Sequence, residues 1–491
     1  MSLTIRNAHA VTPGKDLGNV DIVVGGNRIV SVGEQRSSRN CAHAGDGEER
    51  QRSSWNCSHE AGLEVGAFPR NAMSEDFDVI DAAGLYALPG FIDIHSHGRG
   101  GADFCDLTDE AFDKIGRDKL ADGVTGFLAT GLTRPEEELA ELCRCVERSK
   151  TRYAFRGNAS TSGCSSANCT GATGGAFHGN ASTSGCSSAN CTGATGGAFF
   201  GATCLGVHLE GPFFNPAMAG AQNPAYLRKP DAAMVKRLHA ISPIVKVSLA
   251  PELDGAEDCI RELVAAGIVV SGGHSAADYA TFERARAAGM THLTHFCNAM
   301  MPAHHLRPTM VNGGLLADDV YAEVITDGVH LSDPMIRLIA KCKGPDKVMV
   351  ITDAMCAAGE PDGIYSLGGL RVKVENGKAT LADVPYDPKA VVSNVAGSVA
   401  LYPQCFKRYV QATGLPLEEA VKATSYNQCV SLGIPDRGEI AEGKVADIVL
   451  VDEKLDPQVT IVGGQVLWRM DSTQRRRGAE MSQTPRLRVS V

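Results

Sequence analysis

Six side chains that can bind a divalent metal occur where predicted strands end in this sequence. His95 and His97 lie one residue apart in the segment GFIDIHSHG, so in a strand their side chains would share one face. Imidazole and carboxylate groups are ligands that Zn²⁺ and Fe²⁺ accept. The other candidates end later apolar runs: Glu210 in CLGVHLEGP, His274 in IVVSGGHS, His295 in THLTHF and Asp353 in VMVITDAM.

Each of these residues also has a structural explanation when it is taken alone. A histidine at a strand end is usually only hydrogen-bonded to its neighbours. Glu210 could serve the turn that follows it, and Asp353 could cap the next helix. These explanations do not account for four histidines and two carboxylates at the ends of successive strands. We therefore interpret the six residues as one metal site, and we assign His208 and His292 to structural roles.

The elements that must position this site follow one repeated pattern from residue 89 to residue 437. A helical pattern, a glycine, an apolar strand and a polar cluster recur, as in FDKIGRDKLADGVTGFLATG and EDCIRELVAAGIVVSGGHS. Repeated βα units over about 300 residues predict a parallel sheet closed into a (β/α)8 barrel. An open doubly wound sheet is the alternative, but no GxGxxG follows the first strand. Functional residues of such barrels lie at the carboxyl ends of the strands, where the six candidates stand.

Both ends of the chain show the alternation that is typical of β-strands. The first 33 residues contain LTIRNAHAV and VDIVVGGNRIVSVG, and the C-terminal region contains GEIAEGKVADIVLVD and QVTIVGGQVLW. We expect residues 1–88 and 438–470 to form a small β-sandwich domain together. Residues 471–491, rich in Arg and Ser, are expected to form a loose tail.

Two low-complexity segments interrupt these domains. The first, at about 34–76, contains QRSSRNCAHAG and a second, imperfect copy of it. The second, at about 154–200, contains AFRGNASTSGCSSANCTGATGG followed by AFHGNASTSGCSSANCTGATGG. Neither carries an apolar stripe that could offset the entropy of ordering the chain, so we expect disordered insertions. The cysteine pairs of the repeats could bind a metal, but no histidine or acid lies between the two cysteines of either pair.

The composition excludes several classes of function. The formal net charge of −10 argues against a nucleic-acid partner, whose phosphates need a basic face. No apolar run reaches the roughly 18 residues of a membrane span, and the N-terminus lacks the features of a secretory signal. The 16 cysteines are mostly single and many lie in apolar segments such as HFCNAM, which is typical of free thiols. We therefore expect a cytoplasmic protein that acts on a small molecule, without a nucleic-acid or membrane partner.

Short motifs along the chain carry a specific resemblance. FIDIHSHG, GVHLEGPFFN, RKPDAA, GGHS, THFCNAM, DGVH and ITDAM together resemble the N-acetylglucosamine-6-phosphate deacetylases of the amidohydrolase superfamily. The likeness covers nearly everything except the two insertions and the tail. It implies metal-dependent hydrolysis of the acetamide of N-acetylglucosamine 6-phosphate to glucosamine 6-phosphate and acetate. It also implies a homodimer, because members are commonly homodimers whose partner subunit helps to close the phosphate site.

The resemblance implies how the metal ligands divide between two sites. Glu210, His274 and His295 match a metal site shared by all members of the family. His95 and His97 match a pair that can hold a second metal, with Glu210 as the bridge. The cofactor would be Zn²⁺ or Fe²⁺, with one or two ions per subunit.

The resemblance also implies roles in catalysis and substrate binding. Asp353 matches the group that takes a proton from water and later delivers it to the departing amine. A divalent metal would lower the pKa of water and polarise the acetyl carbonyl. The substrate is expected to contact the following residues: Ala221, Gln222, Asn298, Ala299, Arg307, His330 and Ala396.

Two positions depart from the family pattern. Gln222 stands where the family usually has a histidine that helps to polarise the acetyl carbonyl, and glutamine can donate only a neutral hydrogen bond. In HHLRP, Leu306 takes the place of the arginine that grips the phosphate, and Arg307 follows it. We expect Arg307 to anchor the phosphate and Leu306 to fill an apolar gap beside His305. Two alternatives stay open: an amidohydrolase that deacetylates another N-acetyl sugar, unphosphorylated or of another epimer, and a catalytically inactive sugar-binding protein.

Overall fold

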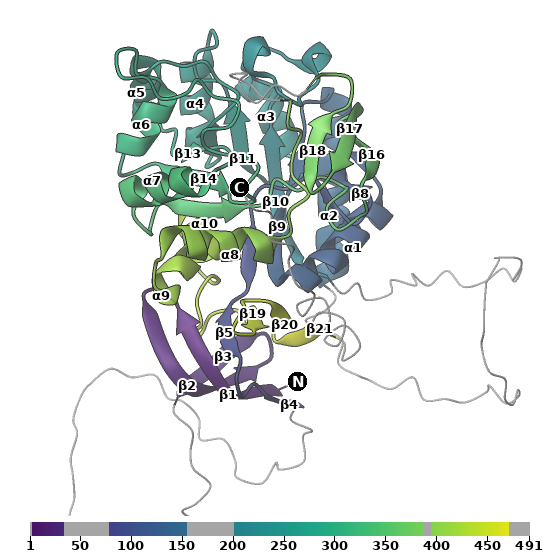
Figure 1. Cartoon of the computed structure of the whole chain (residues 1–491). Coiled ribbons are helices and arrows are strands. Elements are labelled where there is room, and N and C mark those ends of the chain that lie inside the picture. The colour runs from purple at the N-terminus through teal and green to yellow at the C-terminus, as the bar shows by residue number, and fades with distance from the viewer. Residues whose placement is uncertain (1, 34–77, 155–200, 386–393, 471–491) are drawn as a thin grey trace, which may run out of the picture.

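A barrel of parallel strands forms the centre of the computed structural model, which describes residues 2–33, 78–154, 201–385 and 394–470 (Figure 1). The insertion expected at 34–76 and the tail lie outside these residues, as does the repeat insertion except for Ala154. Within the described ranges, no helix is long and apolar enough to cross a membrane.

The barrel strands pair in chain order, each parallel to the next. They are β6 (Phe91–Asp93), β9 (Val124–Gly131), β10 (Thr203–Glu210), β11 (Ile244–Leu249), β12 (Val269–Gly272), β13 (His292–Leu293), β14 (Tyr321–Ile325) and β15 (Val348–Ile351). The circle closes where the backbone N–H of Asp353 donates to the carbonyl oxygen of His95 at 2.9 Å. The predicted (β/α)8 barrel is therefore confirmed.

Helices surround the barrel because each buries one apolar side against the strands. The first, for example, begins at the N-cap Thr108 and turns Phe112 and Ile115 inward. The strands are covered on both faces, which explains their nearly continuous apolar runs. The helices are α1 (Asp109–Asp118), α2 (Glu136–Ala154), α3 (Ala232–His239), α4 (Ala256–Ala265), α5 (Tyr279–Ala287), α6 (Met310–Leu316), α7 (Asp333–Lys343), α8 (Tyr402–Thr413), α9 (Leu417–Ala420) and α10 (Tyr426–Ser431).

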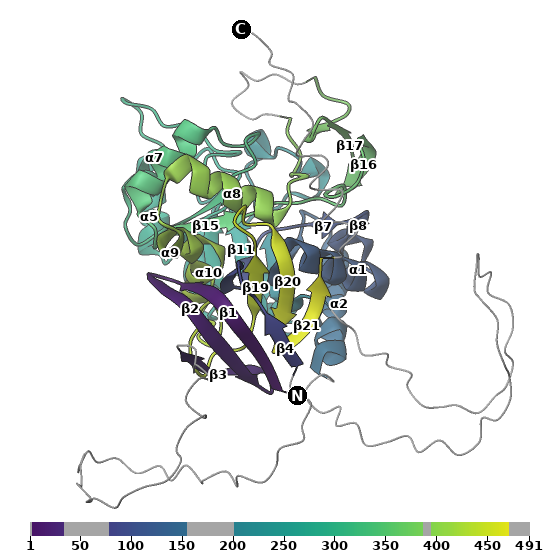
Figure 2. The same cartoon turned by 60° about the horizontal axis from the view of Figure 1, so that its bottom comes forward.

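The two ends of the chain meet in a second sheet, which Figure 2 brings to the front. The strand order is β21-β20-β19-β5-β1-β2-β3, and β4 pairs with β1. Ile5, Ile22 and Ile448 share one apolar cluster, so residues from both ends bury each other. The strands are β1 (Ser2–Thr12), β2 (Lys15–Gly25), β3 (Arg28–Gly33), β4 (Asp78–Asp81), β5 (Tyr86–Pro89), β19 (Ile448–Val451), β20 (Pro457–Val462) and β21 (Gln465–Arg469).

A smaller antiparallel sheet follows β15 and was not predicted. It consists of β16 (Gly363–Leu367), β17 (Leu370–Glu375) and β18 (Lys378–Leu381). A two-stranded ribbon, β7 (Gly98–Arg99) and β8 (Ala102–Asp103), lies after β6. The signal for the small sheet was present in VKVENGKATL, since the Asn376–Gly377 pair has φ of 54° and 75°, as a tight hairpin turn requires. The sheet packs against Leu132 and Met355, next to the site end of the barrel.

Candidate metal-dependent active site

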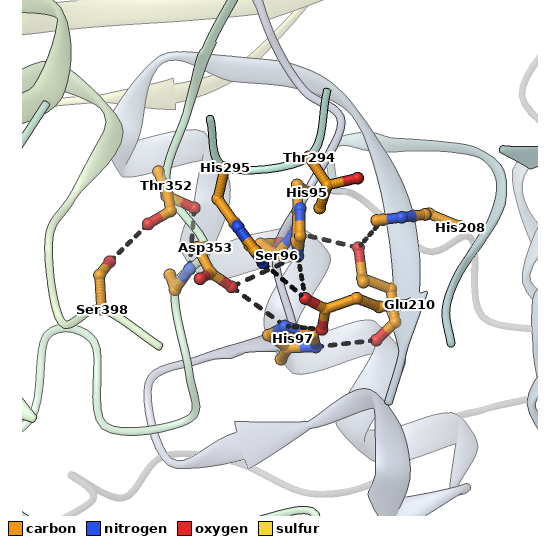
Figure 3. Close-up of polar contacts among 12 residues, drawn as sticks. His95, Ser96, His97, His208, Glu210, Thr294, His295, Thr352, Asp353 and Ser398 are labelled. Carbon is orange, nitrogen blue, oxygen red and sulfur yellow. Dashed lines mark hydrogen bonds and ion pairs between the residues drawn. The ribbon is translucent and has the colours of Figure 1, made fainter. Parts of the chain in front are cut away.

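The six predicted ligands meet at the carboxyl end of the barrel, and all six are buried. Parallel strands in one barrel bring the residues that follow them to the same end, so residues far apart in sequence converge (Figure 3). Their origins are as follows: His95 and His97 follow β6, Glu210 ends β10, His274 follows β12, His295 follows β13 and Asp353 follows β15.

Three of the ligands lie on backbone in the left-handed region. The φ angles are 47° at His274, 32° at His295 and 50° at Asp353. Residues other than glycine adopt such angles where the surrounding structure holds them, and these positions are concentrated at functional sites. At Asp353 the holding contacts are the N–H bond to the His95 carbonyl, 2.9 Å, and a bond from the Ser398 N–H to the Asp353 carbonyl, 2.8 Å.

Glu210, His274 and His295 form the first group of ligand atoms. The Nε2 atoms of His274 and His295 lie 3.2 and 3.1 Å from Oε1 of Glu210. Nδ1 of His274 lies 2.9 Å from the carbonyl oxygen of Met218, which can only accept a hydrogen bond. Nδ1 of neutral His274 therefore carries the proton, and Nε2 directs a lone pair at a carboxylate oxygen. That arrangement needs a cation between the two atoms.

His95, His97 and Asp353 form the second group. Oδ1 of Asp353 lies 3.0 Å from Nε2 of His97 and 3.4 Å from Nε2 of His95. Nε2 of His97 is also 3.2 Å from Oε2 of Glu210, so Glu210 reaches both groups. Nδ1 of His97 lies 3.2 Å from the carbonyl oxygen of Thr130, which again leaves Nε2 without a proton in the neutral ring.

This donor set fits divalent metal ions. The ligand atoms of each group lie within 4.8 Å of one another, and these are the two such groups found among the described residues. Nε2 of His95 and Oδ1 of Asp353 are buried without a hydrogen-bond partner in the part of the chain that the structure describes. Buried acceptors that face each other are costly unless a positive charge lies between them.

The electrostatics of the site also favour positive charge. Burial alone would raise the pKa values of Glu210 and Asp353, but the charge of His95 beside them contributes to lowering both. Burial would lower the pKa of His95, but the charges of Asp353 and Glu210 help to raise it to about 9. Protons can supply the missing charge in the bare protein, and a divalent metal can replace them.

Two further histidines occupy the barrel interior and have partners of their own. His208 hydrogen-bonds to Oγ of Ser248 at 2.8 Å and to Oγ1 of Thr130 at 3.3 Å. His292 stacks on Tyr321 with the ring centroids 5.2 Å apart. Burial lowers the pKa of His292 to about 3. These environments suit neutral structural histidines.

Gln222 contacts a metal ligand directly. Its Nε2 donates to Oε2 of Glu210 at 2.7 Å, and its Oε1 accepts from the N–H of Thr133 at 2.8 Å. Both ends of the amide are therefore engaged, and the side chain orients Glu210. The preceding residue, Ala221, is partly buried against an apolar cluster beside the site.

Asn298, Ala299 and His330 lie on loops after β13 and β14. Nδ2 of Asn298 donates to the carbonyl of His295 at 3.1 Å, which ties it to a ligand. Ala299 has a φ of 50°, and its carbonyl accepts from Ser275 at 3.0 Å. Nδ1 of His330 lies 2.8 Å from Oδ2 of Asp327. Burial would lower the pKa of His330, but this bond and nearby carboxylates raise it.

Ala396 and Arg307 lie in different surroundings. Ala396 is fully buried in the apolar cluster of the small sheet, and its N–H donates to Ala379 at 3.2 Å. Arg307 lies on an exposed loop, with Nη2 3.4 Å from Nε2 of His304. The prediction that Leu306 fills an apolar gap is wrong, because this side chain is 77% exposed.

Sequence reasoning missed two charged residues inside the barrel. Oε2 of Glu323 lies 3.4 Å from Nδ1 of His95, and Glu323 also pairs with Lys246. Both side chains are fully buried. A single charged residue within each of two apolar runs, IVKVSL and YAEVI, was the signal that could have found them.

Comparison with known proteins agrees with this geometry. The sequence profile of the Amidohydrolase family matches residues 86–467. The chain belongs to the amidohydrolase family. N-acetylglucosamine-6-phosphate deacetylases are among its relatives: that of Lysinibacillus sphaericus is 31% identical, over 82% of this chain and 90% of its own. The human protein of that name is 31% identical, over 80% of this chain and 86% of its own. The resemblance drawn from the motifs is confirmed.

Solved structures give the same answer for this amidohydrolase. The N-acetylglucosamine-6-phosphate deacetylase of Thermotoga maritima matches with a TM-score of 0.69 and 29% identity, covering 95% of this chain and 100% of its own. A mutant of the Mycobacterium smegmatis enzyme in complex with N-acetyl-D-glucosamine-6-phosphate matches with a TM-score of 0.70 and 26% identity, covering 95% and 99%. The fold is therefore that of deacetylases of this kind.

Proposed function

We propose that this amidohydrolase hydrolyses the acetamide of N-acetylglucosamine 6-phosphate to glucosamine 6-phosphate and acetate. The observation that carries the proposal is the convergence of four histidines and two carboxylates at one end of the barrel. Relatives that align with most of the chain bear the name of this activity, including the Bacillus subtilis protein at 32% identity over 77% of this chain and 84% of its own. The homologous structure from Mycobacterium smegmatis contains this sugar phosphate.

The metal would be held by two groups of residues that share Glu210. Glu210, His274 and His295 would hold one ion, and His95 and His97, together with the shared Glu210, would hold a second, giving one or two ions per subunit. A divalent metal, Zn²⁺ or Fe²⁺, supplies Lewis-acid activation of water and of the acetyl carbonyl. Burial of the ligands excludes bulk water and strengthens each electrostatic contact at the reacting group.

Asp353 is the group that moves the proton. Its carboxylate takes the proton from the attacking water and later delivers it to the nitrogen of the departing amine. A divalent metal would replace the protons of the bare site, and its positive charge would keep Asp353 ionised, so Asp353 starts the cycle as the base. The other acid, Glu210, cannot replace it, because Oε1 faces His274 and His295 and Oε2 accepts from Gln222.

Substrate binding is assigned to the loops around the ligands. One N–H of the Gln222 amide donates to Glu210, and the second would be the neutral donor to the acetyl carbonyl. Asn298, Ala299 and His330 face the sugar from the loops after β13 and β14. Arg307 would anchor the phosphate, supported by a second subunit of a homodimer. The protein would act in the cytoplasm, on a small molecule. Ala221 and Ala396 would contribute only packing or backbone contacts.

An acetate-release assay on a panel of N-acetyl sugars, with and without a 6-phosphate, tests this proposal. We expect metal-dependent release of acetate, with the highest kcat/KM for N-acetylglucosamine 6-phosphate. Removing the metal with a chelator should stop the reaction, and adding Zn²⁺ or Fe²⁺ should restore it. Metal-replete protein that releases no acetate from any sugar in the panel would refute the proposal.

A second candidate is deacetylation of an unphosphorylated N-acetyl sugar. The observation that favours it is the exposed loop of Arg307, where Leu306 stands in place of the usual arginine and is 77% exposed. The same panel separates the two candidates. Equal kcat/KM for an N-acetyl sugar and its 6-phosphate would favour the second.

A further inference from the structure

Lys246 and Glu323 form a buried ion pair inside the barrel, beneath the metal ligands. They come from β11 and β14, which β12 and β13 separate in the sheet, so the two side chains meet across the interior. Burying two charges carries a desolvation cost that apolar side chains of similar volume would avoid. The pair is therefore poorly explained by stability alone.

Glu323 touches the ligand set in two ways. Its Oε2 lies 3.4 Å from Nδ1 of His95, while Lys246 binds its other oxygen. Its backbone carbonyl accepts from the N–H of Phe296 at 2.7 Å, next to the ligand His295. Lys246 lies on one oxygen and His95 on the other, so the carboxylate of Glu323 offers an acceptor to each of them.

His95 differs from His97 and His274 in what holds its ring. Nδ1 of His97 and Nδ1 of His274 lie at backbone carbonyls, of Thr130 and Met218. Those acceptors are fixed by the fold, whereas the acceptor of His95 is a side chain. An acceptor at Nδ1 fixes both the ring orientation and the tautomer with a bare Nε2, the form that binds a metal.

We propose that Glu323, held in place by Lys246, is a positioning residue that prepares His95 to bind the second metal ion, beside His97 and Asp353. The proposal rests on the metal-dependent function proposed above. Lys246 binds one carboxylate oxygen and so turns the other toward His95. The pair thereby sets the affinity of the second ion without contacting it or the substrate.

The ammonium of Lys246 makes the variant Glu323→Gln informative. The amide oxygen should face Lys246, so the NH₂ group must face Nδ1 of His95. His95 would then accept at Nδ1 and carry its proton on Nε2, where it cannot bind a metal. In the double variant Lys246→Met/Glu323→Gln the amide is free to flip and to present its oxygen to His95. The double variant should therefore regain what the single variant loses.

Titration of the metal-free full-length protein with Zn²⁺, with bound metal counted, tests the proposal. We expect two ions per subunit in the wild type and in Glu323→Gln a loss of about 10- to 100-fold in affinity for one of them. The ion at Glu210, His274 and His295 should remain. The double variant should recover most of the lost affinity. If Glu323→Gln does not fold, Glu323→Asp, which shortens the reach to His95, carries the same expected loss.

Lys119→Met is the matched control, because it breaks another buried ion pair, from Lys119 to Oδ2 of Asp93 at 2.8 Å, that contacts none of the six ligands. It should lower the melting temperature and leave both ions bound. Three results would overturn the proposal. They are an unchanged affinity for the second ion in Glu323→Gln, no recovery of that affinity in the double variant, and the same loss of affinity in the control. A wild type that is active with one bound ion would overturn the role of Glu323 but leave the proposed deacetylase function intact. A wild type that binds two ions but has no activity would refute the deacetylase function and leave the role of Glu323 intact.

Discussion

Replacement of Asp353 by asparagine should remove most of the turnover and leave the protein folded. The side chain is buried, with Oδ1 3.0 Å from Nε2 of His97 and 3.4 Å from Nε2 of His95. An amide has nearly the same shape, and its NH₂ group can donate to these bare nitrogens. It cannot accept and return a proton during the reaction. The chemical step, and not the fold, should therefore suffer.

The size of the loss follows from the absence of a substitute base. Loss of a general base typically lowers the rate by about 10²–10⁴-fold, which corresponds to about 2.7–5.5 kcal/mol in the barrier. The neighbouring acid Glu210 has both oxygens engaged, one at His274 and His295 and the other at Gln222. We therefore expect kcat to fall by about 10³–10⁴-fold, in the upper half of this range.

Acetate release at matched metal content measures this effect. The ion at Glu210, His274 and His295 should stay bound in the variant, because Asp353 does not belong to that group. Asp103→Asn is a suitable control, since Asp103 is also buried, but its side chain caps a short 3-10 helix, accepting from the Cys105 N–H at 2.8 Å and from the backbone of Asp106. The control should stay within a few-fold of the wild type. A kcat of Asp353→Asn within tenfold of the wild type, with metal bound, would refute the assignment of the base.

Three further predictions concern the insertion, the phosphate and acid stability. Deletion of residues 154–197 should preserve fold, bound metal and activity, because loop-closure entropy changes only logarithmically with length. Deletion of 176–197 alone, which removes one repeat, is the comparison. Loss of metal from the protein that lacks 154–197 would contradict this prediction. Arg307→Ala should lower kcat/KM about 10- to 100-fold for the 6-phosphate substrate only, since a charge-assisted hydrogen bond contributes about 1.5–3 kcal/mol. Equal falls for phosphorylated and unphosphorylated sugars would exclude Arg307 as the anchor. His292 has a pKa of about 3 when folded and a usual value of 6.5, so the unfolded chain takes up its proton first and stability falls by about 1.4 kcal/mol for each pH unit below 6.5. Between pH 7 and pH 5 the free energy of unfolding, measured with urea, should therefore fall by about 2 kcal/mol less in His292→Gln than in the wild type. Equal decreases in the two proteins would rule this out.

The barrel and the metal ligands could be predicted from local pattern. Each βα unit can be identified from a helical period, a glycine and an apolar run, and none of these features depends on the rest of the chain. Parallel strands place whatever follows them at one end of the barrel, so His95, Glu210 and Asp353 had to meet there. The hairpin at Asn376–Gly377 carries an equally local signal, since both residues adopt the positive φ angles that its turn requires.

Tertiary structure alone decided which side chains hold one another. Alternation in IVKVSL and YAEVI cannot say that Lys246 and Glu323 meet, because their strands are not neighbours in the sheet. The contact exists because the barrel closes and brings opposite walls within reach of two long side chains. The directions of loop side chains could not be predicted, because irregular backbone has no periodicity that fixes where a side chain points. The contact of Gln222 with Glu210 and the exposure of Leu306 therefore became known only from the tertiary structure. The sequence by itself determines the repeated βα units, and the closed barrel determines which side chains contact one another.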